Sequence, residues 1–225
     1  MTFINNKGRL ERTTLGDIRD FNDLVRYNYD PQEIKKYDPQ TAIQNHPLMN
    51  KPFAIRSKLA YSGLIKELHP TKHYLLPGQL AMFGYAQPKY KEDLEYYDAT
   101  PLTLFCGITR TKGGNIREIG LNLHYFPIFA RTRILDITYT RFKPYWQKYF
   151  NDPSKKPNML ISWDSLKHIM KSNMHLAFGI KMYIPVLRGN TYLVPTRLFS
   201  TAAMTEGHFA KATINQVMRY WRHFQ

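Results

Sequence analysis

Alternation of apolar and polar residues is clearest in the middle of the chain, where it predicts β-strands. Gly113 and Gly114, in the sequence RTKGGN, supply the positive φ of a tight hairpin turn between two of these strands. The predicted strands are PGQLAMFGY (77–85), PLTLFCGIT (101–109), IREIGLNLHY (116–125) and a late closing strand, TYLVPTRLF (191–199). Strands joined by one long loop and a hairpin indicate a small antiparallel β-barrel core of the SH3-like type.

Apolar residues spaced three to four apart predict helices on both sides of this core. The segment DIRDFNDLVRY (17–27) places its apolar residues on one helical face, and residues 39–76 form a proline-containing connecting arm with short helices. At the other end, Thr213 and Gln216 make a capping box. The apolar stripe of this C-terminal helix comprises Ile214, Val217, Met218, Trp221 and Phe224.

These elements predict an α+β chain with helical N- and C-terminal extensions, in three parts. Residues 1–76 are a helical arm, and residues 77–140 are the small β-barrel core with the helix that follows it. Residues 141–225 are a basic mixed segment that contributes the closing strand and the C-terminal helix. Within that last part, LAFGIKMYIPVLRG (176–189) is expected to form one or two strands before a turn at Gly189–Asn190.

Charge points to an anionic partner. The formal net charge is +15 and the pI is about 9.8, a balance that suits nucleic acid, a membrane surface or an acidic protein. Most of the excess lies in residues 141–225, which hold 13 basic and 3 acidic side chains. The sequence has no uncharged run of about 18 residues and begins without an apolar signal core, so we expect no membrane partner.

Basic side chains after the predicted core are interleaved with aromatic ones. Cations beside stackable rings suit frayed or single-stranded nucleic acid, and the same residue types dominate subunit interfaces. The candidate nucleic-acid contacts are Arg131, Arg133, Arg141, Lys143, Lys148, Lys155 and Lys156. The candidate interface residues are Trp146, Tyr149, Trp221 and Phe224.

Signatures of enzymes are absent from the sequence. There is no phosphate-binding glycine loop, no dinucleotide-binding glycine fingerprint and no nucleophile elbow, and the eight histidines are scattered. The single cysteine, Cys106, lies in an apolar strand, where a buried and inert thiol is expected. Acidic residues gather at 92–98, but lysines alternate with them, as in an exposed loop. We therefore expect no catalytic residue, metal site or cofactor.

The stretch GLNLHYFP (120–127) poses the sharpest question about chemistry. On a strand, Asn122 and His124 would share one face, opposite the leucines and Tyr125. Catalysis by His124 would need a carboxylate beside it, for which Asp98 and Asp136 are candidates that the sequence does not place. Alternation alone explains the pattern as the polar face of a strand, and we interpret it as a structural feature.

Two longer stretches resemble a known family. PGQLAMFGYAQPKYKEDLEYYDATPLTLF (77–105) and GLNLHYFPIFARTRILD (120–136) are similar to virion proteins of tailed bacteriophages that are described as DNA end protectors. The resemblance is good over residues 75–140 and weak in the basic C-terminal part. The matching positions are Pro77, Gly78, Tyr96, Tyr97, Asp98, Pro101, Leu102, Gly120 to Tyr125, Pro127 and Arg131.

The resemblance implies a non-enzymatic structural component of the phage virion, at the head–neck or the tail. Such a protein would be assembled in the host cytoplasm. It would bind other virion proteins in a ring or symmetric assembly and contact double-stranded DNA at the packaged end. Two alternatives remain open at this point: a small-barrel nuclease acting on nucleic acid, and a regulatory nucleic-acid-binding module without a role in the virion.

Overall fold

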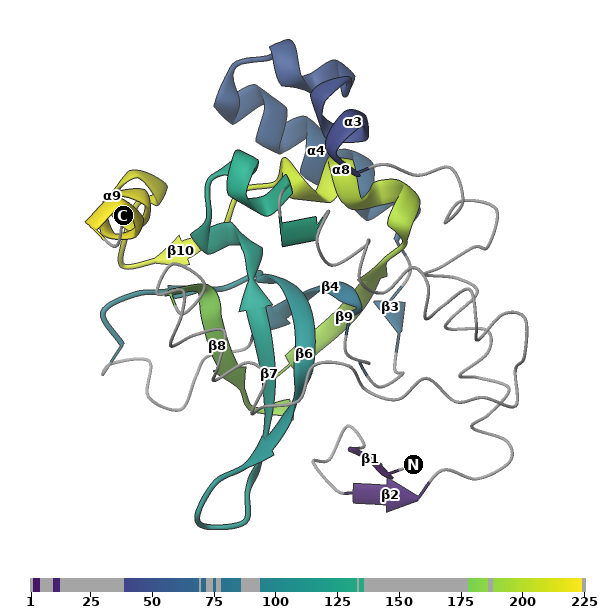
Figure 1. Cartoon of the computed structure of the whole chain (residues 1–225), viewed down its shortest axis with the longest axis vertical. Helices are drawn as coiled ribbons and strands as arrows, with labels where there is room; N and C mark the ends of the chain where they lie inside the picture. Colours follow the sequence, from purple (N-terminus) through teal and green to yellow (C-terminus); the bar gives the residue numbers. More distant parts are fainter. Residues whose placement is uncertain are drawn as a thin grey trace.

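A six-stranded antiparallel sheet forms the centre of the molecule (Figure 1). The computed structural model describes residues 2–4, 10–12, 39–68, 70–71, 75, 78–85, 94–132, 134–135, 178–185 and 188–223. The strand order is β3–β9–β4–β6–β7–β8. These strands are β3 (Pro70–Thr71), β4 (Leu80–Tyr85), β6 (Leu102–Arg110), β7 (Ile116–Asn122), β8 (Ile180–Tyr183) and β9 (Arg188–Val194).

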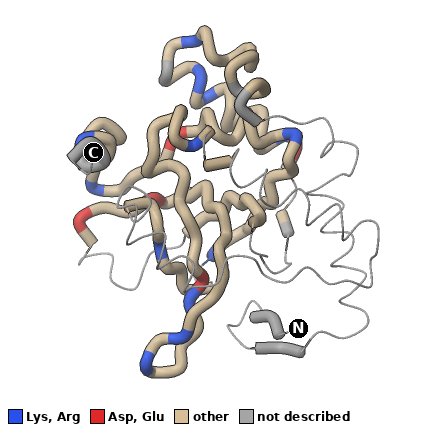
Figure 2. The backbone as a smooth tube through the Cα atoms, viewed as in Figure 1, with Lys and Arg blue, Asp and Glu red and all other residues tan. Residues whose placement is uncertain are grey.

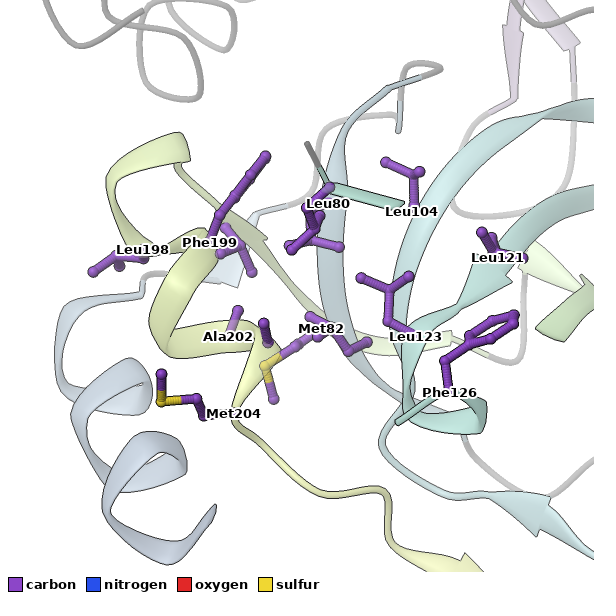
Figure 3. Close-up of a cluster of buried hydrophobic side chains, with 14 of the residues drawn as sticks. Leu80, Met82, Leu104, Leu121, Leu123, Phe126, Leu198, Phe199, Ala202 and Met204 are labelled. Atoms are coloured by element: carbon purple, nitrogen blue, oxygen red, sulfur yellow. The ribbon is translucent and has the colours of Figure 1, made fainter. Parts of the chain in front are cut away.

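Both faces of the sheet are covered, which explains its long apolar runs. Along β4, Leu80 and Met82 enter one buried cluster, whereas Ala81 and Phe83 enter another on the opposite face. Figure 3 shows the larger cluster between the sheet and the helices that pack beside it. The predicted strands are confirmed as β4, β6 and β7. The predicted closing strand pairs with β4 as β9, but it ends at Val194, because Thr196–Leu198 form a 3-10 turn and a helix begins at Phe199.

The sheet is open, which corrects the predicted barrel. A barrel needs its two edge strands to pair, and within the described residues the edges β3 and β8 lie at opposite ends of the strand order. The α+β class with an antiparallel sheet holds. The sheet also draws β8 and β9 from the basic segment, and β9 runs through Gly189–Asn190, where we expected a turn.

Helices cover one end of the sheet (Figure 1). They are α3 (Pro39–Gln44), the 3-10 turns η1 (Pro47–Asn50) and η4 (Thr196–Leu198), α4 (Phe53–Glu67) and α8 (Phe199–Ala203). In α4, Ser57, Ala60 and Leu64 are buried at spacings of three and four, so this face packs inward toward α8. The connecting arm thus contains a helix of 15 residues, longer than expected.

The C-terminal helix α9 (Ile214–His223) begins as predicted. Gln216 N donates to Thr213 Oγ1 at 3.3 Å, and Thr213 N donates to Gln216 Oε1 at 2.7 Å, which is a complete capping box. Val217 is fully buried in the main cluster, and Met218 packs against that cluster. The side chain of Trp221 and the whole of Phe224 lie outside the described residues.

Two small sheets complete the described structure. One pairs β1 (Thr2–Ile4) with β2 (Leu10–Arg12), in a region where we expected only helix. The other pairs β5 (Tyr97–Asp98) with β10 (Phe209–Ala210). The predicted helix at 17–27 lies outside the described residues. No described helix has the length and apolar character needed to cross a membrane.

Candidate functional site

His124 does not lie on a strand, because β7 ends one residue after Leu121. The Asn122 side chain accepts a hydrogen bond from His124 N at 3.0 Å and caps the 3-10 turn η2 (Leu123–Tyr125). This local turn corrects the predicted strand 116–125 and rotates His124 into the protein interior. Gly120 is required upstream, because a Cβ there would lie 2.1 Å from Thr103 Cγ2.

The turn places His124 between a carboxylate and a hydroxyl. Its Nδ1 lies 2.8 Å from Asp98 Oδ2, and its Nε2 lies 3.0 Å from Thr205 Oγ1. Asn122 donates to the same carboxylate oxygen at 3.0 Å, and the backbone of Thr100 donates to the other at 3.1 Å. Asp98 is therefore the partner that catalysis by His124 would need, and only the fold brings it there.

The electrostatic environment makes Asp98 an anion and leaves the ring of His124 neutral. Burial raises the pKa of Asp98, but His124, Asn122 and the backbone of Thr100 outweigh it and hold that pKa below the ordinary value. Burial lowers the pKa of His124, and the nearby Arg131 guanidinium lowers it further against the pull of Asp98. An ionised carboxylate only accepts hydrogen bonds, so the proton of neutral His124 is on Nδ1.

Arg131 supplies the matching buried cation, which corrects its prediction as a nucleic-acid contact. The side chain is 1% exposed and reaches four backbone carbonyls. Its Nε donates to Phe126 O at 2.7 Å, and the guanidinium also donates to the carbonyls of Ala203, Thr205 and His124. Burial lowers its pKa to about 10, so it stays charged at neutral pH. It ties η2 to the end of α8 and is not available to DNA.

The order carboxylate, imidazole, hydroxyl is that of hydrolase triads, but this one is closed to substrate. Thr205 is 0% exposed, and its hydroxyl lies 2.7 Å from the carbonyl oxygen of Ala202. Neither His124 nor Thr205 lines either of the two cavities described below. In the described ranges no three metal-ligating side chains come together, and burial raises the pKa of Cys106 to about 12. The network can organise packing, and its imidazole and hydroxyl reach neither cavity.

Beside this network lies a cavity of about 330 Å³, which we call the tyrosine cavity. It is lined by five tyrosines: Tyr85, Tyr96, Tyr97, Tyr125 and Tyr183. Four of the rings form two contacting pairs, with centroids 5.3 Å apart in Tyr85–Tyr183 and 6.0 Å apart in Tyr96–Tyr125. Two cations, Lys181 of β8 and Arg117 of β7, line it as well.

Lys181 is held in the cavity by aromatic rings. Its Nζ lies 4.1 Å from the centre of the Tyr125 ring and 5.6 Å from that of Phe178. Burial lowers its pKa to about 8. Sequence analysis missed this residue, although a lone cation in the apolar run LAFGIKMYIP was a usable signal.

A second cavity, of about 630 Å³, lies along α4 and is also lined by Glu206 and His208. Lys58 and Lys66 lie on this side of the helix, and Tyr61 contacts His208 with ring centroids 5.6 Å apart. The helix exposes Ile55 and Leu59 as well, at 52% and 46%. This part of α4 thus combines apolar and cationic side chains at the surface.

A basic ribbon of two strands extends from the sheet. β4 pairs only with Leu102–Leu104 of β6, and β8 pairs only with Glu118–Leu121 of β7, so residues 107–117 form a free hairpin (Figure 1). Figure 2 shows basic residues at its tip. Arg110 and Lys112 are exposed there, and residues 107–117 contain no acidic side chain. Gly114, at φ 77°, makes the predicted turn.

The other predicted site residues lie outside the described part of the chain. These are Arg133, Arg141, Lys143, Lys148, Lys155, Lys156, Trp146, Tyr149 and Phe224, together with the side chain of Trp221. Their contacts with nucleic acid or with subunits therefore stay predictions. In the acidic segment 92–98, Glu92 and Asp93 also lie outside, Glu95 is exposed, and Asp98 belongs to the buried network.

The fold and the candidate site define a basic α+β protein. Its buried polar network stabilises packing, and the side chains of the ribbon and the tyrosine cavity are cationic and aromatic. The family model of the Phage T4 terminal DNA protecting protein matches residues 43–197, more than half of the chain. The chain belongs to this family, which confirms the resemblance to DNA end protectors. No curated protein and no solved structure matches it.

Proposed function

We propose that this protein is a non-enzymatic component of a tailed-phage particle that binds the terminus of the packaged DNA and shields it. The family match over residues 43–197 carries the proposal, because the family is described by protection of terminal DNA. The net charge of +15 supports a polyanionic partner.

The ribbon at 107–117 offers a surface for duplex DNA. A two-stranded β-ribbon fits the major groove of B-DNA, which is about 12 Å wide. Arg110 and Lys112 at its tip can neutralise phosphates, and no acidic side chain on the ribbon opposes them. Phosphate contacts of this kind carry no sequence information, which suits a protein that must bind whatever sequence lies at the end.

A binding role is favoured over a nuclease by the state of the buried network. The Asp98–His124–Thr205 arrangement is the part of the described structure that comes closest to an acid–base centre, and its members are at most 4% exposed. General acid–base chemistry needs the catalytic group within hydrogen-bond reach of substrate. A protein can shield a DNA end simply by binding to it.

Location at the head–neck or tail, and contact with other virion proteins in a symmetric assembly, complete the proposal. The apolar residues Ile55 and Leu59 on the surface of α4 support a protein contact, because exposed apolar patches mark interaction sites. A cryo-EM map of the particle tests the location. Mass spectrometry of purified particles tests presence in the virion, and absence from particles would leave the regulatory binding module as the better reading.

The shielding itself is tested with the full chain and a linear duplex. We expect the protein to block an exonuclease that enters from the ends, while an endonuclease still cuts the interior of the same DNA. Equal protection against both enzymes would mean binding along the duplex and would refute end recognition. Degradation of the DNA by the protein alone, lost in His124→Gln, would favour the nuclease alternative.

A further inference from the structure

The tyrosine cavity combines two features that nucleic-acid ligands share. The half-buried rings of Tyr85, Tyr96 and Tyr97 offer surface for stacking, and Lys181 and Arg117 offer positive charge. One carboxylate, Asp98, also lines it, but the two lining cations outnumber it and the buried guanidinium of Arg131 acts on the same carboxylate. The cavity is therefore electrostatically suited to an anion that carries an aromatic ring.

We infer that the tyrosine cavity binds one unpaired nucleotide at the DNA terminus, with the base stacked on its tyrosines and a phosphate beside Lys181. This inference rests on the proposed function and names the part of the DNA that is recognised. Base–aromatic stacking tolerates every base, because each base has a π-face. The site would thus recognise an end without reading its sequence.

Size restricts the occupant to a single nucleotide. A cavity of about 330 Å³ lies near the lower limit of small-molecule sites, which span about 300–1,000 Å³. A base pair within a duplex cannot enter, because the DNA double helix is far wider than the cavity. A base must leave the stack first, and the cost is least for a base that is already unpaired.

This cost explains how a basic protein could prefer ends over the interior of DNA. An interior base loses its pair and two stacking neighbours when it is extruded, whereas a frayed terminal base has one neighbour and no intact pair. The ribbon would bind any duplex through phosphates. The cavity would add affinity only where an unpaired base is available.

Close packing and a hydrogen bond hold the walls of the cavity in place. Gly120 lies opposite Lys181 in the pairing of β7 with β8, and a side chain there would collide with Thr103, because a Cβ would lie 2.1 Å from Thr103 Cγ2. Tyr85 accepts a hydrogen bond from Ile184 N at 3.1 Å, which fixes its ring at the wall. Tyr96 and Tyr97 are half-buried, so their rings remain reachable.

The test compares ligands that differ only in the base. The full chain is titrated, by fluorescence anisotropy, with a duplex that ends in one unpaired thymidine and with the same duplex ending in an abasic nucleotide. Both carry the same charge. We expect the thymidine end to bind about fivefold to 150-fold more tightly, the range produced by one base–ring stack. Equal affinities would overturn the inference without any change to the protein.

Protein variants then locate the effect. Tyr96→Leu should reduce the preference for the thymidine end. Lys181→Gln loses a contact with a phosphate that both ends carry, so it should weaken binding to both open ends. Lys112→Gln, on the ribbon, should weaken binding to open and closed duplexes equally. A duplex whose two ends are closed by non-nucleotide linkers, which carry no base, separates this inference from the proposed function. If the protein binds open ends more tightly than closed ends, but binds the abasic end as tightly as the thymidine end, then end binding is supported and binding of a base in the cavity is excluded. If the cavity variants block particle incorporation and leave DNA affinity unchanged, the cavity faces a protein instead.

Discussion

Replacing Arg131 with methionine should destabilise the protein severely, although its side chain is buried and does not reach the surface. The guanidinium donates to the carbonyls of Phe126, Ala203, Thr205 and His124, and each hydrogen bond to a charged group contributes about 1.5–3 kcal/mol. Burial of the cation offsets several kcal/mol of that sum, since a 1% exposed arginine has lost its water.

The net loss of stability depends on the buried groups that lose their partner in the variant. Methionine fills similar volume but leaves buried carbonyls without donors and removes the buried cation that interacts with Asp98. Removing one partner of a buried charge network costs about 3–5 kcal/mol. Because domains of this size are stable by about 5–15 kcal/mol, Arg131→Met would consume much of the total.

Urea unfolding followed by circular dichroism measures this loss. Arg197→Met is the matched control: its ion pair with Glu67 is nearly half exposed, so its loss should cost less than about 1 kcal/mol. Equal effects of the two substitutions, or a cost under about 1 kcal/mol for Arg131→Met, would refute the reasoning.

Three further predictions concern acid stability, the C-terminal helix and the basic segment. The pKa of His124 is lowered in the folded protein. Below about pH 6.5 the unfolded chain therefore binds a proton at His124 more readily than the folded chain, and the free energy of unfolding should fall. His124→Gln should make that fall shallower in unfolding experiments at pH 7 and pH 5. Truncation after Lys211 removes the fully buried Val217 and should impair folding, measured as a lower unfolding midpoint. Replacing Lys143, Lys148, Lys155 and Lys156 with glutamine should flatten the salt dependence of DNA binding by up to about four units.

A specific result would contradict each of these three predictions. An unaltered acid slope in His124→Gln would mean that other groups carry the proton linkage. A truncated chain that unfolds at the same midpoint would show that α9 contributes little to the core. If the four lysine substitutions leave the salt slope unchanged, the basic segment does not touch phosphate, and blocked particle assembly in the same variant would point to an acidic protein surface.

The local elements of this protein were readable in its sequence. Alternation of side chains marked β4, β6, β7 and β9, because strand periodicity is a property of consecutive residues. The capping box at Thr213 and the turn at Gly114 were readable for the same reason: each depends on a few neighbouring residues. The family resemblance rested on these same turns and strands.

Contacts between distant segments were decided by the tertiary structure. Asp98 was one of two possible partners for His124, and pairing within the sheet together with the turn at η2 selected it. Arg131 looked like a surface cation in sequence, because charge alone does not reveal that four carbonyls surround it. The open sheet and the convergence of five tyrosines around Lys181 depend on strand order and register. Periodicity determines which face a side chain occupies, and only packing between segments determines what it meets there.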